Sequence, residues 1–321
     1  MSYLLKVKNL EVKFALRTGT LTALHKINFS LQPGERLGLV GESGAGKSVA
    51  GCAILNLISK PGFISGGEII FQGQDISKYS PQKMRQIRGN EISMIFQDPM
   101  MTLNPVLTIG TQMIETILAH KKISFKQAKE ISIECLKKVA IPSPEKRLDQ
   151  YPFEFSGGMR QRIVIAISLL TNPSLIIADE PTTALDVTIQ AEIMDILLNL
   201  CLEKNMGLIL ITHDLGVVSQ TTQKIIVMYA GRIVEKGPTQ AIIEDPKHPY
   251  TQGLLKALPQ LHKKGEPLYQ IPGIMPSLSQ IPSGCPFHPR CAQKIDICSQ
   301  EEPSLHTYSS DREVACHLFS Q

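Results

Sequence analysis

A glycine-rich loop, Gly41-Glu-Ser-Gly-Ala-Gly-Lys47-Ser48, constrains this 321-residue chain more than any other feature. It fits the pattern G-x-x-x-x-G-K-[ST], and it lies between a predicted strand and a predicted helix. Glycines let backbone N–H groups turn inward around a phosphate, and the start of the helix adds partial positive charge. A plain strand-to-helix turn is the alternative. The context favours a nucleotide site in which Lys47 reaches the β- and γ-phosphates and Ser48 binds Mg²⁺.

The chain around this loop alternates between strand and helix patterns. Apolar runs rich in β-branched residues predict buried strands, which lie at 36–40, 175–178, 208–212 and 224–228. The stretch 108–139 has helical spacing and ends at two prolines, so it predicts an inserted helical subdomain at about 98–160. We therefore expect the α/β class.

Two adjacent acids, Asp179 and Glu180, end the apolar run that begins at Leu175. Carboxylates at the end of a buried strand are costly unless they have a role, although a solvated strand end is the simpler alternative. Beside a phosphate loop, we expect Asp179 to hold Mg²⁺ through water and Glu180 to act as general base. His213 follows another predicted strand and is a candidate for contact with the γ-phosphate.

Composition excludes several classes. The net charge of +4 gives no general field for nucleic acid, so a bound polyanion needs a local site. The apolar runs are far shorter than the ~20 residues that cross a bilayer, and charges interrupt the N-terminal segment where a secretory signal needs an apolar core. We expect a cytosolic chain whose seven cysteines are thiols or metal ligands.

The composition changes near residue 258. Eight of the 21 prolines and four of the seven cysteines lie beyond it. This predicts a domain at 1–258 and a small, irregular, metal-binding extension at 259–321. The extension's cysteines are Cys285, Cys291, Cys298 and Cys316.

Spacing alone does not choose a metal for these cysteines. The pattern C-x5-C-x6-C-x17-C is neither a zinc ribbon nor a bacterial ferredoxin motif. Four thiolates in one segment argue for a single tetrahedral site, and zinc, an iron–sulfur cluster and metal-free thiols all remain open. His288 and His317 are candidate zinc ligands, with local packing as the alternative.

The segment Phe155-Ser-Gly-Gly-Met-Arg-Gln-Arg162 resembles the signature motif of ATP-binding-cassette (ABC) ATPases, and the resemblance covers residues 4–258. It implies a P-loop ABC ATPase core. Ser156, Gly157 and Gly158 then form a second phosphate cradle, and two subunits pack head to tail so that each nucleotide lies between one loop and the other subunit's signature.

The resemblance also assigns roles along the chain. Phe14 is placed where the family stacks an aromatic ring on adenine, and Asp186 ends the interface loop Ala184-Leu185-Asp186. The residues expected around the nucleotide also include Gly41, Glu42, Ser43, Gly44, Ala45, Gly46, Lys47, Ser48 and Val49. Expected magnesium ligands are Ser48, Gln97 and Asp179, and expected catalytic residues are Lys47, Gln97, Glu180 and His213.

Within that family, Tyr151-Pro-Phe-Glu-Phe155, Asp179-Glu-Pro-Thr-Thr183 and Asp245-Pro-Lys-His-Pro-Tyr250 resemble the ATPase subunits of dipeptide, oligopeptide and nickel importers. So does the tail around Cys285 and Cys291. This implies ATP-driven uptake with a second homologous ATPase, two membrane permeases and an external binding protein, on the cytoplasmic face of the inner membrane. It favours a [4Fe–4S] cluster over Zn²⁺ in the tail.

Other functions remain as alternatives. A nickel or other solute importer shares all these motifs. A soluble ABC-type ATPase acting on DNA or ribosomes is opposed by the lack of a second cassette and of basic clusters. A small-molecule kinase would leave the signature unexplained.

Overall fold

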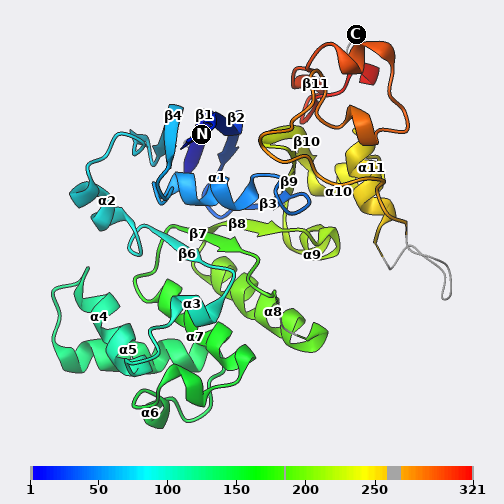
Figure 1. Cartoon of the computed structure of the whole chain (residues 1–321). Helices are drawn as coiled ribbons and strands as arrows, with labels where there is room; N and C mark the ends of the chain where they lie inside the picture. The colour runs from blue at the N-terminus through cyan, green and yellow to red at the C-terminus, as the bar shows by residue number, and fades with distance from the viewer. Residues whose placement is uncertain (1–2, 184–185, 259–268, 320–321) are drawn as a thin grey trace. The chain divides into compact units, whose positions relative to one another are not determined.

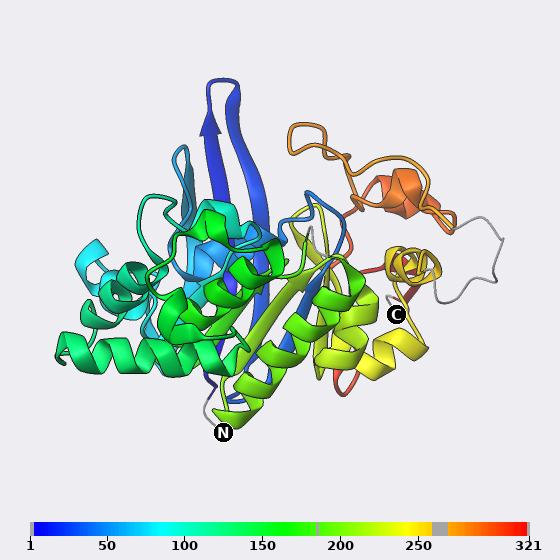
Figure 2. The ribbon, with the colours of Figure 1, turned by 90° about the horizontal axis from the view of Figure 1, so that it is seen from below.

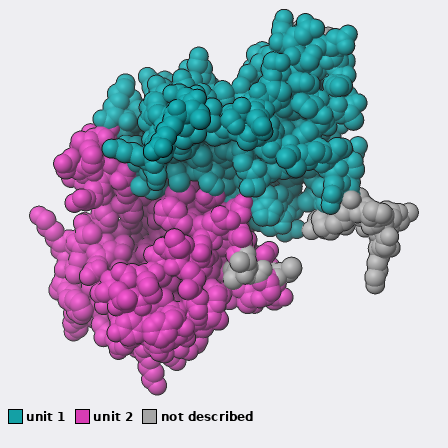
Figure 3. Space-filling model, in the orientation of Figure 1, with its two compact units in different colours: residues 1–78, 210–321 teal, residues 79–209 magenta. Residues whose placement is uncertain are grey.

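The computed structural model describes residues 3–183, 186–258 and 269–319. The chain forms two compact units, coloured separately in Figure 3. Unit 1 comprises residues 1–78 and 210–321, and unit 2 comprises residues 79–209. The predicted domain boundary at 258 adjoins residues 259–268, which lie outside the described residues, and it stays a prediction.

Unit 1 contains an antiparallel sheet with the strand order β2-β1-β4-β5. Its first two strands form a long hairpin, dark blue in Figure 2, in which buried apolar residues alternate with more exposed ones, as a half-buried sheet requires. The strands are β1 (Leu5–Leu16), β2 (Gly19–Leu31), β4 (Gly62–Phe71) and β5 (Gln74–Asp75).

A second sheet in unit 1 has the order β11-β12-β10-β9-β3. β3 (Arg36–Val40) runs parallel to β9 (Lys224–Tyr229), and both are buried apolar runs, whereas β10 (Arg232–Pro238) is antiparallel to β9. The unit's helices are α1 (Lys47–Ile54), α9 (Leu215–Thr221), α10 (Thr239–Glu244) and α11 (Pro249–Lys256), labelled in Figure 1.

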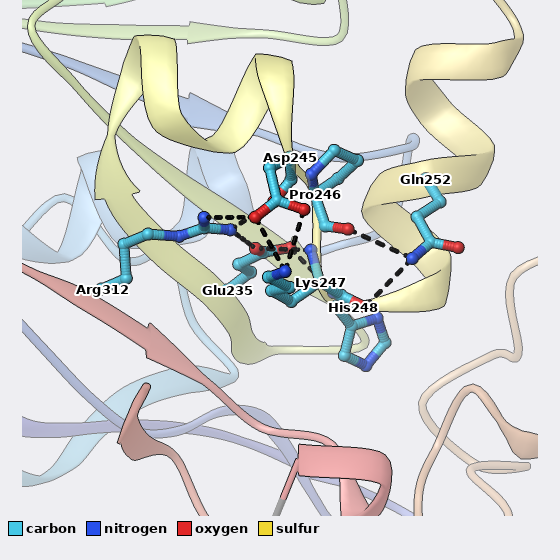
Figure 4. A network of polar contacts seen from close by, with 7 residues as sticks. All are labelled: Glu235, Asp245, Pro246, Lys247, His248, Gln252 and Arg312. Carbon is cyan, nitrogen blue, oxygen red and sulfur yellow. Dashed lines mark hydrogen bonds and ion pairs between the residues drawn. The ribbon is translucent and has the colours of Figure 1, made fainter. Parts of the chain in front are cut away.

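The C-terminal extension is less irregular than we expected. Its described residues form short 3₁₀ helices and also a hairpin, β11 (His306–Ser309) and β12 (Arg312–Val314), whose second strand pairs with β10. Arg312 forms an ion pair of 2.9 Å with Glu235 of β10, and the two side chains are 9% and 1% exposed (Figure 4). The 3₁₀ helices are η3 (His288–Arg290), η4 (Asp296–Ser299) and η5 (His317–Phe319).

Unit 2 is mostly helical and contains two parallel strands, β6 (Ile92–Ile95) and β7 (Leu175–Asp179). The strand β8 (Gly207–Thr212) contains the sequence boundary between the units. The helices of unit 2 are α2 (Pro81–Ile87), α3 (Pro99–Thr102), α4 (Ile109–Leu118), α5 (Phe125–Lys138), α6 (Pro144–Arg147), η1 (Pro152–Glu154), α7 (Gly157–Leu169) and α8 (Val187–Glu203).

Local sequence explains the helix boundaries in the stretch expected to be helical. Thr108 caps α4, and Ser124 forms a capping box with Gln127 at the start of α5. α7 continues to Leu169, beyond the expected end of the helical region at 160, because most of its residues from Ile163 onward are apolar and buried. No helix among the described residues is both long enough and apolar enough to span a lipid bilayer.

Candidate functional site

The glycine-rich loop joins the end of β3 to the start of α1 in unit 1. Gly41 has φ of 154°, and a Cβ there would clash with the carbonyl oxygen of Met228. Gly46 adopts a left-handed conformation with φ of 102° as the N-cap of α1. Both positions therefore require glycine. The loop leads directly into the N-terminus of α1, and this arrangement of backbone and helix is typical of phosphate-binding loops.

Lys47 lies across this loop. Its ammonium group donates to the carbonyl oxygens of Gly41 at 2.8 Å and Glu42 at 3.0 Å, and the residue is only 5% exposed. A buried cation inside a loop of this shape fits the β- and γ-phosphates of a nucleotide. Ser48, in the first turn of α1, is exposed and carries the hydroxyl expected to bind Mg²⁺.

The remaining nucleotide-binding candidates of unit 1 lie on separate elements. Phe14 is half-buried on β1, opposite Gly62 of β4 and Leu21 of β2, so its ring belongs to the antiparallel sheet. His213 is exposed directly after β8, and the adjacent Asp214 caps α9 by accepting hydrogen bonds from two backbone N–H groups.

In unit 2, the carboxyl ends of β6 and β7 bring two predicted catalytic residues together. The strands are parallel, with Ile95 opposite Ala178. The amide of Gln97 donates to the Glu180 carboxylate at 3.1 Å, and the hydroxyl of Thr183 donates to the same oxygen at 2.9 Å. Two hydrogen bonds thus orient the carboxylate predicted to be the general base.

The backbone at Glu180 is unusual. Its φ is 45°, in the left-handed region that residues with a Cβ rarely adopt. Asp179, the last residue of β7, is 6% exposed. Strained backbone beside a buried carboxylate is typical of functional sites, and oxygen ligands of this kind suit Mg²⁺.

The signature residues border a hollow of about 420 Å³ within unit 2. Ser156 caps α7 by accepting from the N–H of Met159, and Asp186 caps α8 by accepting from the N–H of Ile189. The N-termini of α7 and α8 therefore border the same hollow, and Gly157 and Gly158 lie at its edge. Backbone N–H groups at helix N-termini are suited to binding an anion. Ala184 and Leu185 of the interface loop lie outside the described residues.

The four cysteines of the extension are partly or fully buried. Burial, with a smaller contribution from the neighbouring thiols, raises the pKa of Cys285 and of Cys316 to about 11. Among the described residues, no group of three or more His, Cys, Asp or Glu side chains is arranged to hold a metal ion. The four thiols nevertheless lie near enough to one another for Cys285, Cys291 and Cys298 to contribute to the raised pKa of Cys316, and the expected iron–sulfur or zinc site stays a prediction.

Each of the two histidines considered as zinc ligands makes a local hydrogen bond through one ring nitrogen. The ring of His288 donates to the carbonyl oxygen of Cys285 at 3.0 Å, and that of His317 donates to the carbonyl oxygen of Glu301 at 2.8 Å. These contacts match the alternative of local packing.

Comparison with known proteins decides the family. Residues 24–183 match the family model described as "ABC transporter". The dipeptide transport ATP-binding protein DppD of Escherichia coli is 46% identical to the chain, over 98% of this chain and 96% of DppD. This chain belongs to the ABC transporter family. Residues 234–298 of this ABC transporter chain also match the model "Oligopeptide/dipeptide transporter, C-terminal region".

A further relative and a solved structure support the same family and fold. The oligopeptide transport ATP-binding protein OppD of Escherichia coli is 48% identical, over 98% of this ABC transporter chain and 92% of OppD. A dimeric, post-hydrolysis structure of the ATP-binding cassette MJ0796 with ADP and Pi is 26% identical with a TM-score of 0.66, covering 73% of this chain and 98% of that one. The expected P-loop ABC ATPase fold is confirmed.

The sequence patterns did not predict roles for two residues that contact the ABC transporter motifs. Thr183 orients Glu180, and Arg290 of the extension forms an ion pair with Glu42 of the phosphate loop. Thr183 lies three residues beyond Glu180, so its proximity was a usable signal. Arg290 lies 248 residues from its partner, and nothing in the local pattern connects them.

Proposed function

We propose that this chain is the ATP-hydrolysing subunit of an ABC importer that takes up dipeptides or oligopeptides. The observation that carries the proposal is the match along nearly the whole chain, including the C-terminal region, to relatives named as dipeptide and oligopeptide transport ATP-binding proteins. The phosphate loop and the Gln97–Glu180 pair supply the residues that ATP hydrolysis requires.

Each residue has a role in this mechanism. Lys47 binds the β- and γ-phosphates of ATP and stabilises the charge that develops there during transfer. Glu180 accepts a proton from the attacking water, while Gln97 and Thr183 hold its carboxylate. Ser48, Gln97 and, through water, Asp179 would hold Mg²⁺, which would neutralise phosphate charge. His213 contacts the γ-phosphate or the attacking water.

The two phosphate cradles imply a dimer. The loop beside Lys47 and the hollow at Ser156 each expose N–H groups at a helix N-terminus. We propose that two ATPase chains, identical or homologous, pack head to tail and bind each nucleotide between one loop and the other chain's signature. ATP binding closes this dimer and hydrolysis opens it.

The remaining partners follow from the family. We place the chain on the cytoplasmic face of the cell membrane, bound to two permease subunits that receive solute from an external binding protein. The helical subdomain contacts the permeases, and Gln97 transmits the nucleotide state to it.

The metal content of the extension is a separate proposal. We propose that its four cysteines bind a [4Fe–4S] cluster, with Zn²⁺ as the alternative, in a structural or redox-sensing role. Anaerobic purification followed by metal analysis and absorbance near 400 nm tests it. Protein that contains neither iron nor zinc overturns it.

Replacing Glu180 with Gln tests the main proposal. Glu180→Gln keeps the shape and the hydrogen bonds but removes the base, so we expect purified complex to bind ATP and to lose at least about 99% of its hydrolysis rate. Cells whose only copy carries Glu180→Gln should then fail to take up labelled dipeptides and oligopeptides. Normal hydrolysis would overturn the base assignment, and unchanged peptide uptake would overturn the substrate in favour of nickel or another solute.

A further inference from the structure

An arginine of the C-terminal extension is bound directly to the phosphate loop. The guanidinium of Arg290 donates two hydrogen bonds to the two carboxylate oxygens of Glu42, at 2.7 and 2.9 Å. The Arg290 side chain is 5% exposed, and that of Glu42 is 31% exposed. Bidentate pairs of this kind are among the stronger polar contacts in proteins, and arginine suits them because its planar group matches a carboxylate.

The extension holds Arg290 in place for this contact. Its Nε donates to the carbonyl oxygen of Pro272 at 2.8 Å, and its Nη1 approaches the hydroxyl of the buried Tyr229 at 3.4 Å. An arginine guanidinium is protonated throughout the physiological pH range, so this side chain is charged. The residue is therefore a fixed cation beside the loop.

Glu42 is fixed from its other side as well. Its backbone N–H donates to the hydroxyl of Tyr250 at 2.8 Å, and its carbonyl oxygen accepts from Lys47 at 3.0 Å. Glu42 thus belongs to the same loop whose lysine and N–H groups suit a nucleotide phosphate. A carboxylate at this position repels a polyphosphate unless a cation neutralises it.

We propose that Arg290 is a positioning residue of the nucleotide site, which neutralises Glu42 and thereby sets the affinity for ATP. The extension is then part of the phosphate site in electrostatic terms, although none of its own residues has to touch the nucleotide. This inference rests on the proposed binding of ATP at the loop.

Calorimetric titration of the full-length chain with Mg-ATP and Mg-ADP tests the proposal. Arg290→Ala leaves the Glu42 charge beside the phosphates, so we expect the Kd for ATP to rise about tenfold and the Kd for ADP, which carries one charge less, to rise less. Adding Glu42→Gln removes the repelling charge. The double variant Glu42→Gln with Arg290→Ala should return to within about threefold of the wild-type Kd.

A second variant distinguishes neutralisation of the Glu42 charge from a purely structural role of the ion pair. It remains informative if Arg290→Ala fails to fold. Glu42→Gln alone weakens the ion pair but also removes the repulsion, so we expect ATP to bind at least as tightly as to the wild type. A purely structural role predicts weaker binding by Glu42→Gln and no recovery in the double variant, and either result overturns the proposal.

Arg312→Gln is the matched control, because it breaks another buried ion pair between the extension and the rest of unit 1. It should lower the melting temperature and leave the Kd for ATP unchanged at temperatures where the chain is folded. Failure of the wild-type chain to bind ATP would overturn the proposed function, whereas wild-type affinity in a folded Arg290→Ala variant would overturn only this inference.

Discussion

The carboxylate of Glu180 has its position set by backbone strain and by two side chains. Its left-handed φ of 45° costs on the order of 1–3 kcal/mol, which the surrounding structure has to offset. Gln97 and Thr183 donate to the same carboxylate oxygen. These two hydrogen bonds and the backbone conformation together orient the carboxylate that is predicted to accept a proton from water.

Replacing Thr183 with Val tests this arrangement. Thr183→Val keeps the shape of the side chain and removes one hydrogen bond to a charged group, so we expect kcat for ATP hydrolysis to fall about tenfold. The KM for ATP should change less than about threefold, because Thr183 is placed to orient the base. Steady-state ATPase assays measure both values. Thr182→Val is the neighbouring control, and an equal effect of the two variants would contradict the assignment.

Sequence predicted one part of this residue-level picture and missed another. The two acids at the end of a buried strand formed a local pattern, and the family resemblance added Gln97, which follows β6 more than eighty residues earlier. The bond from Thr183 to Glu180 and the Arg290–Glu42 pair depend on side-chain positions that only the folded backbone defines. The separation of three residues was a usable signal for Thr183, whereas the 248 residues between Arg290 and Glu42 left no signal in the sequence pattern.

At the scale of elements, α11 begins at a buried histidine. The Nδ1 of His248 accepts a hydrogen bond from the backbone N–H of Tyr250 at 3.0 Å, and the residue is 1% exposed. Burial lowers the pKa of His248 to about 3, from an ordinary value of 6.5. The folded chain therefore keeps this imidazole neutral and uses it as the N-cap of α11.

This cap predicts a pH dependence of stability. Between about pH 6.5 and 3 the unfolded chain binds a proton at His248 and the folded chain does not, so this contribution to the free energy of unfolding is lost as the pH falls. The loss amounts to roughly 1.4 kcal/mol for each pH unit below 6.5. Urea unfolding at several pH values measures it, and His248→Gln should give a shallower slope over that range. Equal slopes in both proteins would contradict the prediction.

Element-level predictions were best where strands are buried on both faces. β3, β7, β8 and β9 all coincide with continuous apolar runs, because such strands need apolar residues throughout. The hairpin of β11 and β12 was missed, since its short strands are largely polar and their stability comes from pairing with β10. Their sequence resembles that of a loop.

At the scale of the whole molecule, the end of the chain completes a sheet that begins near residue 36. β12 pairs with β10, and Arg312 neutralises Glu235, whose carboxylate also accepts from the backbone N–H groups of Lys247 and His248. The predicted division into an ATPase domain and an appended tail followed a real change in composition. Composition could not show that the tail donates a strand to the ATPase sheet.

Arg312→Gln should accordingly destabilise unit 1. Removing one partner of a buried ion pair leaves Glu235 without its counter-charge, and we expect the free energy of unfolding to fall by about 3–5 kcal/mol. Lys236→Gln breaks the more exposed pair with Glu313 on the same two strands and should cost less than about 1 kcal/mol. Denaturant titrations of the two variants compare them directly, and similar losses would show that burial at Glu235 does not matter.

The contact between Arg290 and Glu42 has a consequence for the order of events during synthesis. The loop leaves the ribosome 248 residues before its counter-ion. At typical rates of translation this interval is on the order of tens of seconds. A nascent chain that has folded its first strands therefore carries an uncompensated carboxylate at its phosphate loop, and by our proposal it binds nucleotide tightly only after Arg290 has been added and has folded against the loop.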